Sequence, residues 1–206
     1  METLDCGKLT AGVVALDCHN PLVQGVKGTA LIFNHDDIDL DATTIDASGV
    51  MTELKLKAGA SAYWVKTKDG GIDTNIAFVK GTYYDGFDQN FVLRLFDNTP
   101  AIKAFLNELA ILGAKVCVVV QNKYVKMKPT APELKGETVY ELFGFYTGLE
   151  LNELTRDSTD TDTKGGYAVT LGCDENQKEP SLPITVFKTS LSATDDMLNA
   201  LVVTTP

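Results

Sequence analysis

A capped amphipathic helix is the feature that most restricts how this chain can fold. Thr99 can accept a hydrogen bond from a free N–H group of the first turn, and Pro100 occupies a position where no N–H is needed. Gly113 can end the helix because glycine tolerates the left-handed conformation common at that position. Between these ends, apolar side chains recur at helical spacing: Ile102, Phe105, Leu106 and Leu109. The pattern predicts a helix at about 99–113 that packs one side against a sheet.

The residues after this helix predict a strand buried on both faces. The segment Lys115–Val120 is almost continuously apolar, and a short run of this kind suits a strand covered from both sides. Cys117 lies inside the run and is expected to be a small core residue. The helix and this strand together indicate a layered core rather than an open, one-sided sheet.

Much of the remaining chain alternates between apolar and polar residues at the period of a strand. Leu54 and Leu56 fall on one side of such a pattern, whereas Lys55 and Lys57 fall on the other. The further predicted strands are 29–34, 52–57, 61–67, 74–80, 90–96, 139–146, 149–151, 167–171 and 184–188. The chain is therefore expected to be mainly β.

Two features are expected near the C-terminal strands. Gly148 should bend the chain between two strands, because glycine in a strand commonly marks a bulge or bend. A short closing helix is expected over 195–201, capped by Ser192 or Thr194.

The dipeptide Asp85-Gly86 is the strongest hairpin signal in the chain, because both residues tolerate the positive φ angles of a two-residue turn. Three aromatic residues surround it: Tyr83, Tyr84 and Phe87. Aromatic side chains are enriched in the cores of interfaces, so these residues are interface candidates. The alternative, that the tip folds back on its own domain, stays open.

These elements predict an α+β, mainly β domain built as a β-sandwich or barrel with one flanking amphipathic helix. Residues 1–28 read as an N-terminal arm or docking loop, since they lack a sustained period. Residues 29–206 then form a single β-rich domain, with exposed loops at about 126–136 and 157–166.

Charge and composition exclude several classes of protein. The net charge of −10 opposes nucleic-acid binding, which needs a basic surface. No stretch is apolar enough to span a bilayer, so no membrane partner is expected. The four cysteines lie far apart, without the spacing of a zinc site or a disulfide framework, which suits a reducing cytoplasm.

No pattern predicts catalysis, a cofactor or a metal site. His19 and His35 are the only histidines, and neither lies at the spacing of a known nucleophilic motif. The acidic stretch 37–41 begins like a calcium loop, but Ala42 stands where the loop needs glycine and Ser48 where it needs glutamate. The acidic cluster at 157–162 is interpreted in the same way, as a solvated loop.

Three stretches resemble virion structural proteins of phages that infect gut Bacteroidetes, including the crAss-like group: Cys18–Val26, Phe143–Leu149 and Gly166–Leu171. The order of elements from Asp17 to Lys188 also resembles the tail-tube fold of tailed bacteriophages, a β-sandwich or barrel with a flanking helix that forms stacking rings. The resemblance implies a tail-tube or tail-ring protein without catalytic residues or cofactors. Its partners would be copies of itself and neighbouring virion proteins.

The leading hypothesis is therefore a non-enzymatic virion component of a phage tail or head-to-tail connector, made in the host cytoplasm. DNA would pass through its ring without specific binding, because acidic side chains lining the channel would repel the phosphates. A capsid-decorating or adhesin-like β domain is the alternative, and an enzyme on a β scaffold is a third hypothesis without a supporting motif.

Overall fold

The computed structural model describes residues 24–80, 85–111, 113–125 and 138–202, and this part of the protein is mainly β. The strands are β1 (Val26–Asn34), β2 (Thr44–Ile45), β3 (Met51–Glu53), β4 (Tyr63–Lys66), β5 (Ile72–Val79), β6 (Gly86–Leu95), β7 (Val116–Val125), β8 (Thr138–Phe143), β9 (Glu150–Thr155), β10 (Tyr167–Gly172) and β11 (Ile184–Val186). The helices are the short η1 (His35–Asp37), α1 (Pro100–Ile111) and α2 (Leu191–Asn199).

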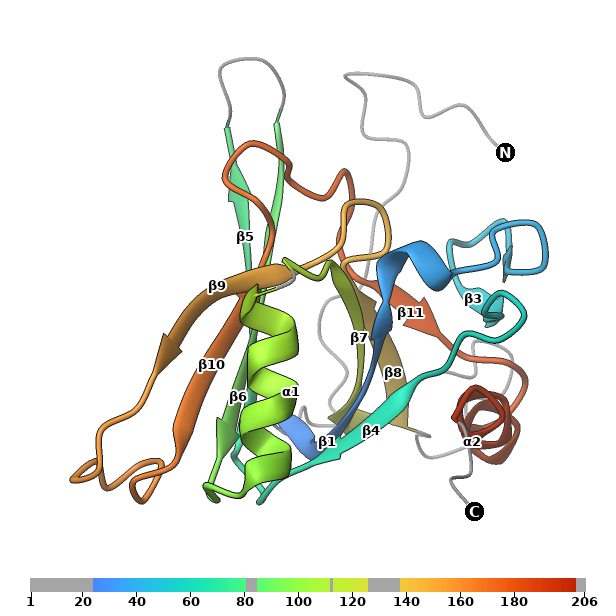
Figure 1. Ribbon diagram of the computed structural model, residues 1–206. Coiled ribbons are helices and arrows are strands. Elements are labelled where there is room, and N and C mark those ends of the chain that lie inside the picture. Colours follow the sequence, from blue (N-terminus) through green and yellow to red (C-terminus); the bar gives the residue numbers. More distant parts are fainter. Residues whose placement is uncertain (1–23, 81–84, 112, 126–137, 203–206) are drawn as a thin grey trace.

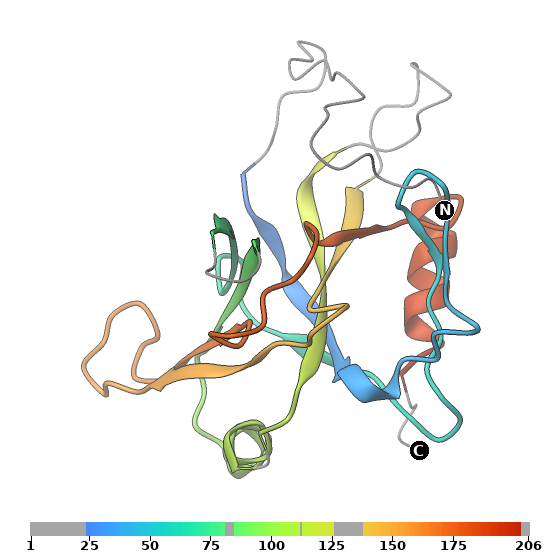
Figure 2. The ribbon, with the colours of Figure 1, turned by 90° about the horizontal axis from the view of Figure 1, so that it is seen from above.

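The strands form two sheets that pack against each other. The larger sheet has seven strands in the order β2-β3-β11-β8-β7-β1-β4, and the smaller has four in the order β5-β6-β10-β9. Figure 1 shows the two sheets side by side, with α1 running along the opening between them and α2 on the far side of the larger sheet. The two sheets do not close into a barrel, so of the two predicted arrangements the barrel is excluded (Figure 2).

The larger sheet is buried on both of its faces. Along β1, Ala30 and Ile32 belong to one hydrophobic core, whereas Leu31 and Phe33 belong to the other. The neighbouring β7 is buried throughout 116–120, which confirms the predicted strand covered from both sides. The molecule therefore has more layers than a simple two-sheet sandwich.

The first core lies between the two sheets and is closed by α1. Leu106 and Leu109 of α1 are buried in it, and Ile102 and Phe105 pack at its margin while remaining partly accessible. The helix predicted from caps and spacing is thus confirmed, and its apolar stripe faces the sheets. The second core lies on the other face of the larger sheet, where Met197 and Leu198 of α2 cover it.

The closing helix begins one turn earlier than predicted. Ser190, not Ser192 or Thr194, is its cap, and the Ser190 side chain accepts a hydrogen bond from the Ala193 N–H at 3.1 Å. Thr194 is fully buried inside the helix, where its hydroxyl donates to the Ser190 carbonyl. Hydroxyl side chains occur at three alternate positions, 190, 192 and 194, and the first of them caps the helix in the folded protein.

The chain passes from one sheet to the other between β8 and β9, where a bend at Gly148 was predicted. Gly144 and Gly148 both adopt positive φ angles, of 73° and 76°. A Cβ atom at Gly144 would approach the side chain of Leu149 to 2.8 Å, so glycine is needed there for space as well as conformation. The predicted strand 139–146 accordingly ends at Phe143.

The hairpin of β5 and β6 is present, but Asp85-Gly86 is not its turn. Val79 pairs with Gly86, so the connection spans 80–85 and Gly86 already belongs to β6. A Cβ atom at Gly86 would approach the Cβ atom of Lys178 to 2.7 Å. Glycine is needed at this position because the segment around Lys178 packs closely against it, and not because the chain makes a tight turn there.

The alternating stretch 52–57 is only partly a strand. The ladder of β3 ends at Glu53, although Leu54 is fully buried and Leu56 forms an isolated bridge with Ile38. The predicted inward and outward sides are correct, but no neighbouring strand continues beside 54–57 among the described residues. β1 begins at Val26, within the range assigned to the N-terminal arm.

Candidate interaction surface

The smaller sheet presents two open edges that run in opposite directions. Each of its neighbouring pairs is antiparallel, so with four strands the outermost ones, β5 and β9, are antiparallel to each other. In the described part of the chain, no strand pairs with the outer side of either one. Open edges expose unpaired N–H and C=O groups and readily accept a further strand.

The hydrogen-bond register identifies which groups of β5 point outward. The Arg94 N–H donates to the Gly71 carbonyl at 2.7 Å, and the pairing continues without a bulge to Val79. Since backbone groups alternate between the two sides of a strand, Asn75 and Ala77 bond to β6. The N–H groups of Ile76 and Phe78 therefore face away from the sheet.

The face of the smaller sheet that points away from the core carries side-chain amides. Asn75 pairs with Asn90, which in turn pairs with Gly172. A Cβ atom at Gly172 would collide with the side chains of Asn90 and Asn152, so glycine leaves room for both amides. A row of uncharged polar groups consequently crosses this face from β5 to β9.

Charges along the smaller sheet are largely compensated. Three carboxylates have basic partners: Asp73 with Arg94, Asp88 with Lys178 at 3.0 Å, and Glu150 with Lys115 at 3.4 Å. This part of the surface is thus less acidic than the net charge of −10 suggests. These ion pairs make the surface of the smaller sheet less acidic than the DNA-channel lining expected from the sequence.

The β5–β6 hairpin extends beyond the rest of its sheet. Strand β10 pairs with β6 only from Asn90 to Leu95, whereas β5 stays paired with β6 as far as Gly86. Figure 1 shows the hairpin rising past the ends of β9 and β10. The inner face of the hairpin, which carries the core-facing side chains of β5, is therefore not covered near the tip. On this face Ile76 is 39% exposed and Phe78 is 56% exposed.

Of the three predicted interface residues, Phe87 lies within the described structure, and Tyr83 and Tyr84 lie outside the described residues. The Phe87 ring packs edge-on against Phe78 of the opposite strand, with ring centroids 5.4 Å apart. Its backbone exchanges two hydrogen bonds with Glu179. Phe87 is half-buried, and it both contacts its own domain and borders a groove.

This groove, the hairpin groove, lies at the base of the protruding hairpin and has a volume of about 460 Å³. It is lined mainly by apolar side chains and two prolines: Ile45, Phe87, Tyr146, Pro180, Leu182 and Pro183. Leu182 is 56% exposed and Tyr146 49%, although both are large. An apolar surface gathered in one place marks a contact site more often than scattered exposed residues do.

Two buried polar side chains fix the loop that forms one wall of the hairpin groove. The Glu179 carboxylate is 1% exposed and accepts hydrogen bonds from the Thr147 N–H at 2.8 Å, the Thr147 hydroxyl at 2.9 Å and the Tyr146 N–H at 3.2 Å. Gln89 donates to the Ser181 carbonyl and accepts from the Gly144 N–H, each at 3.0 Å. The groove is preformed because these bonds hold its loop.

Sequence reasoning missed Gln89 and Glu179. Gln89 occupies a core-facing position of the alternating strand β6, where Phe91 and Leu93 follow it. A polar residue in such a position must find buried partners, so it could have been singled out. Glu179 sits in a loop without any pattern, and only the folded structure brings it to Thr147.

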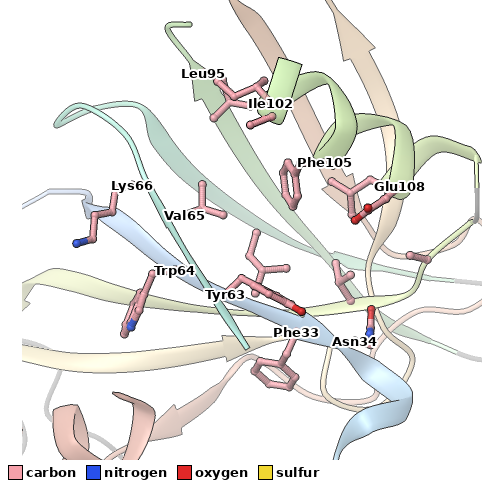
Figure 3. Close-up of a pocket in the computed structure, with 15 residues that line it drawn as sticks. Phe33, Asn34, Tyr63, Trp64, Val65, Lys66, Leu95, Ile102, Phe105 and Glu108 are labelled. Carbon is pink, nitrogen blue, oxygen red and sulfur yellow. The ribbon is translucent and has the colours of Figure 1, made fainter. Parts of the chain in front are cut away.

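A second apolar groove lies between α1 and the edge strand β4, and we call it the α1–β4 groove. Its volume is about 450 Å³. Figure 3 shows Ile102 and Phe105 of α1 facing Val65 and Tyr63 of β4 across it.

The histidine and the acidic loops considered for chemistry have local structural partners. The His35 ring lies 3.1 Å from the Phe145 carbonyl and 3.3 Å from Asp36. Hydrogen bonds from Thr159 lower the pKa of Asp157, and those from Thr163 and Asp162 lower that of Asp160. Among the described residues, no cluster of three or more His, Cys, Asp or Glu side chains is placed to hold a metal ion.

No family model, curated protein or solved structure matches this chain. In the part of the chain that the structure describes, no helix has the length and apolar character needed to cross a membrane. The features of the described residues that bear on function are the sheet edges and the two grooves.

Proposed function

We propose that this protein is a non-enzymatic structural subunit that assembles into a ring or tube, in a phage tail or head-to-tail connector. The observation that carries the proposal is the smaller sheet, whose edges at β5 and β9 run in opposite directions and are open among the described residues. The resemblance in the sequence supplies the virion context.

The direction of the two edges supports a ring of identically oriented subunits. If β5 of one copy pairs with β9 of the next, the new pair is antiparallel like every other pair in the sheet. Each subunit then uses two different surfaces, and such a heterologous contact closes into a ring or continues as a helical filament. Pairing also satisfies the backbone groups that an isolated edge leaves exposed.

The hairpin groove suits contacts between successive rings. The β5–β6 hairpin projects along the strand direction, roughly perpendicular to the direction in which the sheet would grow (Figure 1). Phe78 on the inner face of the hairpin and Leu182 in the hairpin groove are each 56% exposed, and burying them would stabilise stacking.

The amide row gives the proposed assembly a hydrated inner surface with little charge. In a ring joined through β5 and β9, Asn75, Asn90 and Asn152 of successive subunits would form a continuous belt on one face of the sheet. Phosphates need basic groups for tight binding, so a belt of amides with paired carboxylates would let DNA pass without holding it.

Electron microscopy and sedimentation of the purified protein test the proposal. We expect rings or stacked tubes whose fraction rises with protein concentration. A protein that stays monomeric at all concentrations, and instead binds an external partner through the hairpin groove, would contradict a ring and favour the capsid-decorating or adhesin-like alternative.

Cysteine cross-linking tests the edges themselves. In a background with Cys6→Ser and Cys18→Ser, Asn75→Cys on β5 and Glu153→Cys on β9 are made singly and together. Heterologous pairing predicts a ladder of covalent oligomers from the double variant or a series of nearby pairs, and from neither single variant. A dimer from Asn75→Cys alone would indicate that β5 pairs with itself and would overturn the proposed arrangement.

A further inference from the structure

The two edges of the smaller sheet present backbone groups that match each other. On β5 the N–H groups of even-numbered residues, such as Ile76, point away from β6. The same alternation, followed through β6 and β10, directs the N–H group of Glu153 to β10 and that of Leu154 outward. A second copy can therefore bond to either edge with the antiparallel pattern already present in the sheet.

The side chains at the two edges match as well. Even-numbered residues of β5 lie on the face that carries the core, because Ile72 pairs with Leu93 within that core. Leu154 lies on the same face, opposite Val169. Opposite residues of a ladder share a face, so Leu154 must lie opposite an even-numbered β5 residue of the next subunit. The residue opposite Glu153, on the outer face, is then one of four: Asp73, Asn75, Ala77 or Val79.

Charge and strand length separate these four registers. Asp73 and Glu153 are both exposed carboxylates, so a register that sets them opposite each other is unfavourable. Placing Ala77 opposite Glu153 brings Asp73 opposite Asp157, which is also exposed. Placing Val79 there leaves the first half of β9 beyond the end of β5. One register avoids all of these costs.

We propose that β5 of one subunit pairs with β9 of the next with Asn75 opposite Glu153, and that the carboxylates of Asp73 and Glu153 exclude the neighbouring registers. In this register the Asn75 amide can donate a hydrogen bond to the Glu153 carboxylate. Asp73 lies opposite Thr155, whose hydroxyl is also a donor. The inference rests on the proposed joining of β5 to β9 and specifies how the two edges recognise each other.

The same register makes the core face of the joined sheet continuous. A bulge separates Leu151 from Leu154 on β9, so both leucines face the core side. With the bulge counted, Ile76 of the next subunit lies opposite Leu151, and Thr74 lies opposite Leu154. Leu154 and Ile76 are each 39% exposed in the single subunit, and the pairing covers both. Phe78 extends past the start of β9 and stays available for contacts between rings.

A series of cysteine pairs measures the register. In the serine background described above, Asn75→Cys is combined with Glu150→Cys, Glu153→Cys or Thr155→Cys, each of which lies opposite Asn75 in a different register. We expect the Glu153 pair to form covalent oligomers at least about tenfold faster, because positions two residues away lie beyond disulfide reach. The two shifted pairs keep the carboxylates that disfavour their registers, so the comparison is matched.

Reversal of one charge tests the cause of the register. Glu153→Lys should attract Asp73 of the next subunit and so raise the cross-linking rate of the Asn75→Cys and Glu150→Cys pair about fivefold. Glu153→Gln removes the repulsion without adding attraction, and it should raise that rate less. An unchanged rate in the Glu153→Lys protein would overturn the role given to these two carboxylates.

The possible failures are distinguishable. A shifted pair that cross-links fastest would overturn the register but leave β5 joined to β9, as the proposed function requires. Absence of covalent oligomers from all three pairs, in protein whose urea unfolding is unchanged, would overturn the joining itself and with it the proposed function.

Discussion

Proline substitutions at two adjacent positions of β5 distinguish the N–H groups that face away from the sheet from those that bond to β6. Ile76→Pro removes an N–H that faces away from the sheet, whereas Ala77→Pro removes one that bonds to β6 opposite Asp88. Proline is tolerated in an edge strand when its missing N–H faces outward. Ile76→Thr keeps the N–H but changes the side chain, and so controls for the loss of apolar contact.

The expected magnitudes differ for folding and for assembly. Ala77→Pro should lower the free energy of unfolding by about 2–4 kcal/mol, because a ladder hydrogen bond is lost and a carbonyl is left without its donor. Ile76→Pro and Ile76→Thr should each cost about 1 kcal/mol, since Ile76 is already 39% exposed. Between subunits, losing one edge hydrogen bond of roughly 1.4 kcal/mol weakens each contact about tenfold.

Urea unfolding of the monomer and sedimentation across a concentration series measure the two effects separately. Ile76→Pro should fold nearly as stably as Ile76→Thr and yet assemble far less, since each subunit contributes one β5 edge to the ring. Assembly of Ile76→Pro at the same concentration as Ile76→Thr would refute the assignment of β5 as a joining edge.

Three further outcomes are expected. Glu179→Ala should lower the free energy of unfolding by about 2–4 kcal/mol in urea titrations, because it leaves buried donors of Tyr146 and Thr147 unpaired; an unchanged midpoint would contradict the role of this carboxylate. Phe78→Asp should leave the monomer folded, since Phe78 is 56% exposed, but prevent stacking of rings in electron micrographs; intact tubes would exclude the hairpin from stacking. Hydrogen bonds from Lys188 and Lys55 lower the pKa of Glu53 in the folded protein, so its stabilisation is complete above the usual value of about 4.5 and is lost as pH falls through the lower folded pKa. Glu53→Gln should therefore be less sensitive than the unmodified protein to acid over that interval, as measured by thermal unfolding at successive pH values.

Elements with short-range signals could be predicted from the sequence. The helix α1 follows from Pro100 and the 3.6-residue apolar spacing, which act within a few residues of one another. The buried strand β7 follows from its apolar run, and Cys117 is fully buried there as expected. Phe87 was predicted as an interface residue together with Tyr83 and Tyr84, and it borders the hairpin groove, although its interface role stays a prediction.

Features that depend on distant partners could not be obtained in this way. Asp85-Gly86 has the composition of a tight turn, yet Gly86 lies within β6 because Lys178, far along the chain, approaches it closely. Leu54 and Leu56 alternate correctly, but a ladder also needs a neighbouring strand.

The sequence by itself determined the strand-rich class, the amphipathic helix and the inward side of most strands, because propensity and periodicity are properties of neighbouring residues. Only the tertiary structure decided which strands share a sheet, which edges stay open, and how Gln89 and Glu179 shape the hairpin groove. Those outcomes arise from contacts between segments far apart in the chain, where a backbone group finds its partner only after the layers have packed.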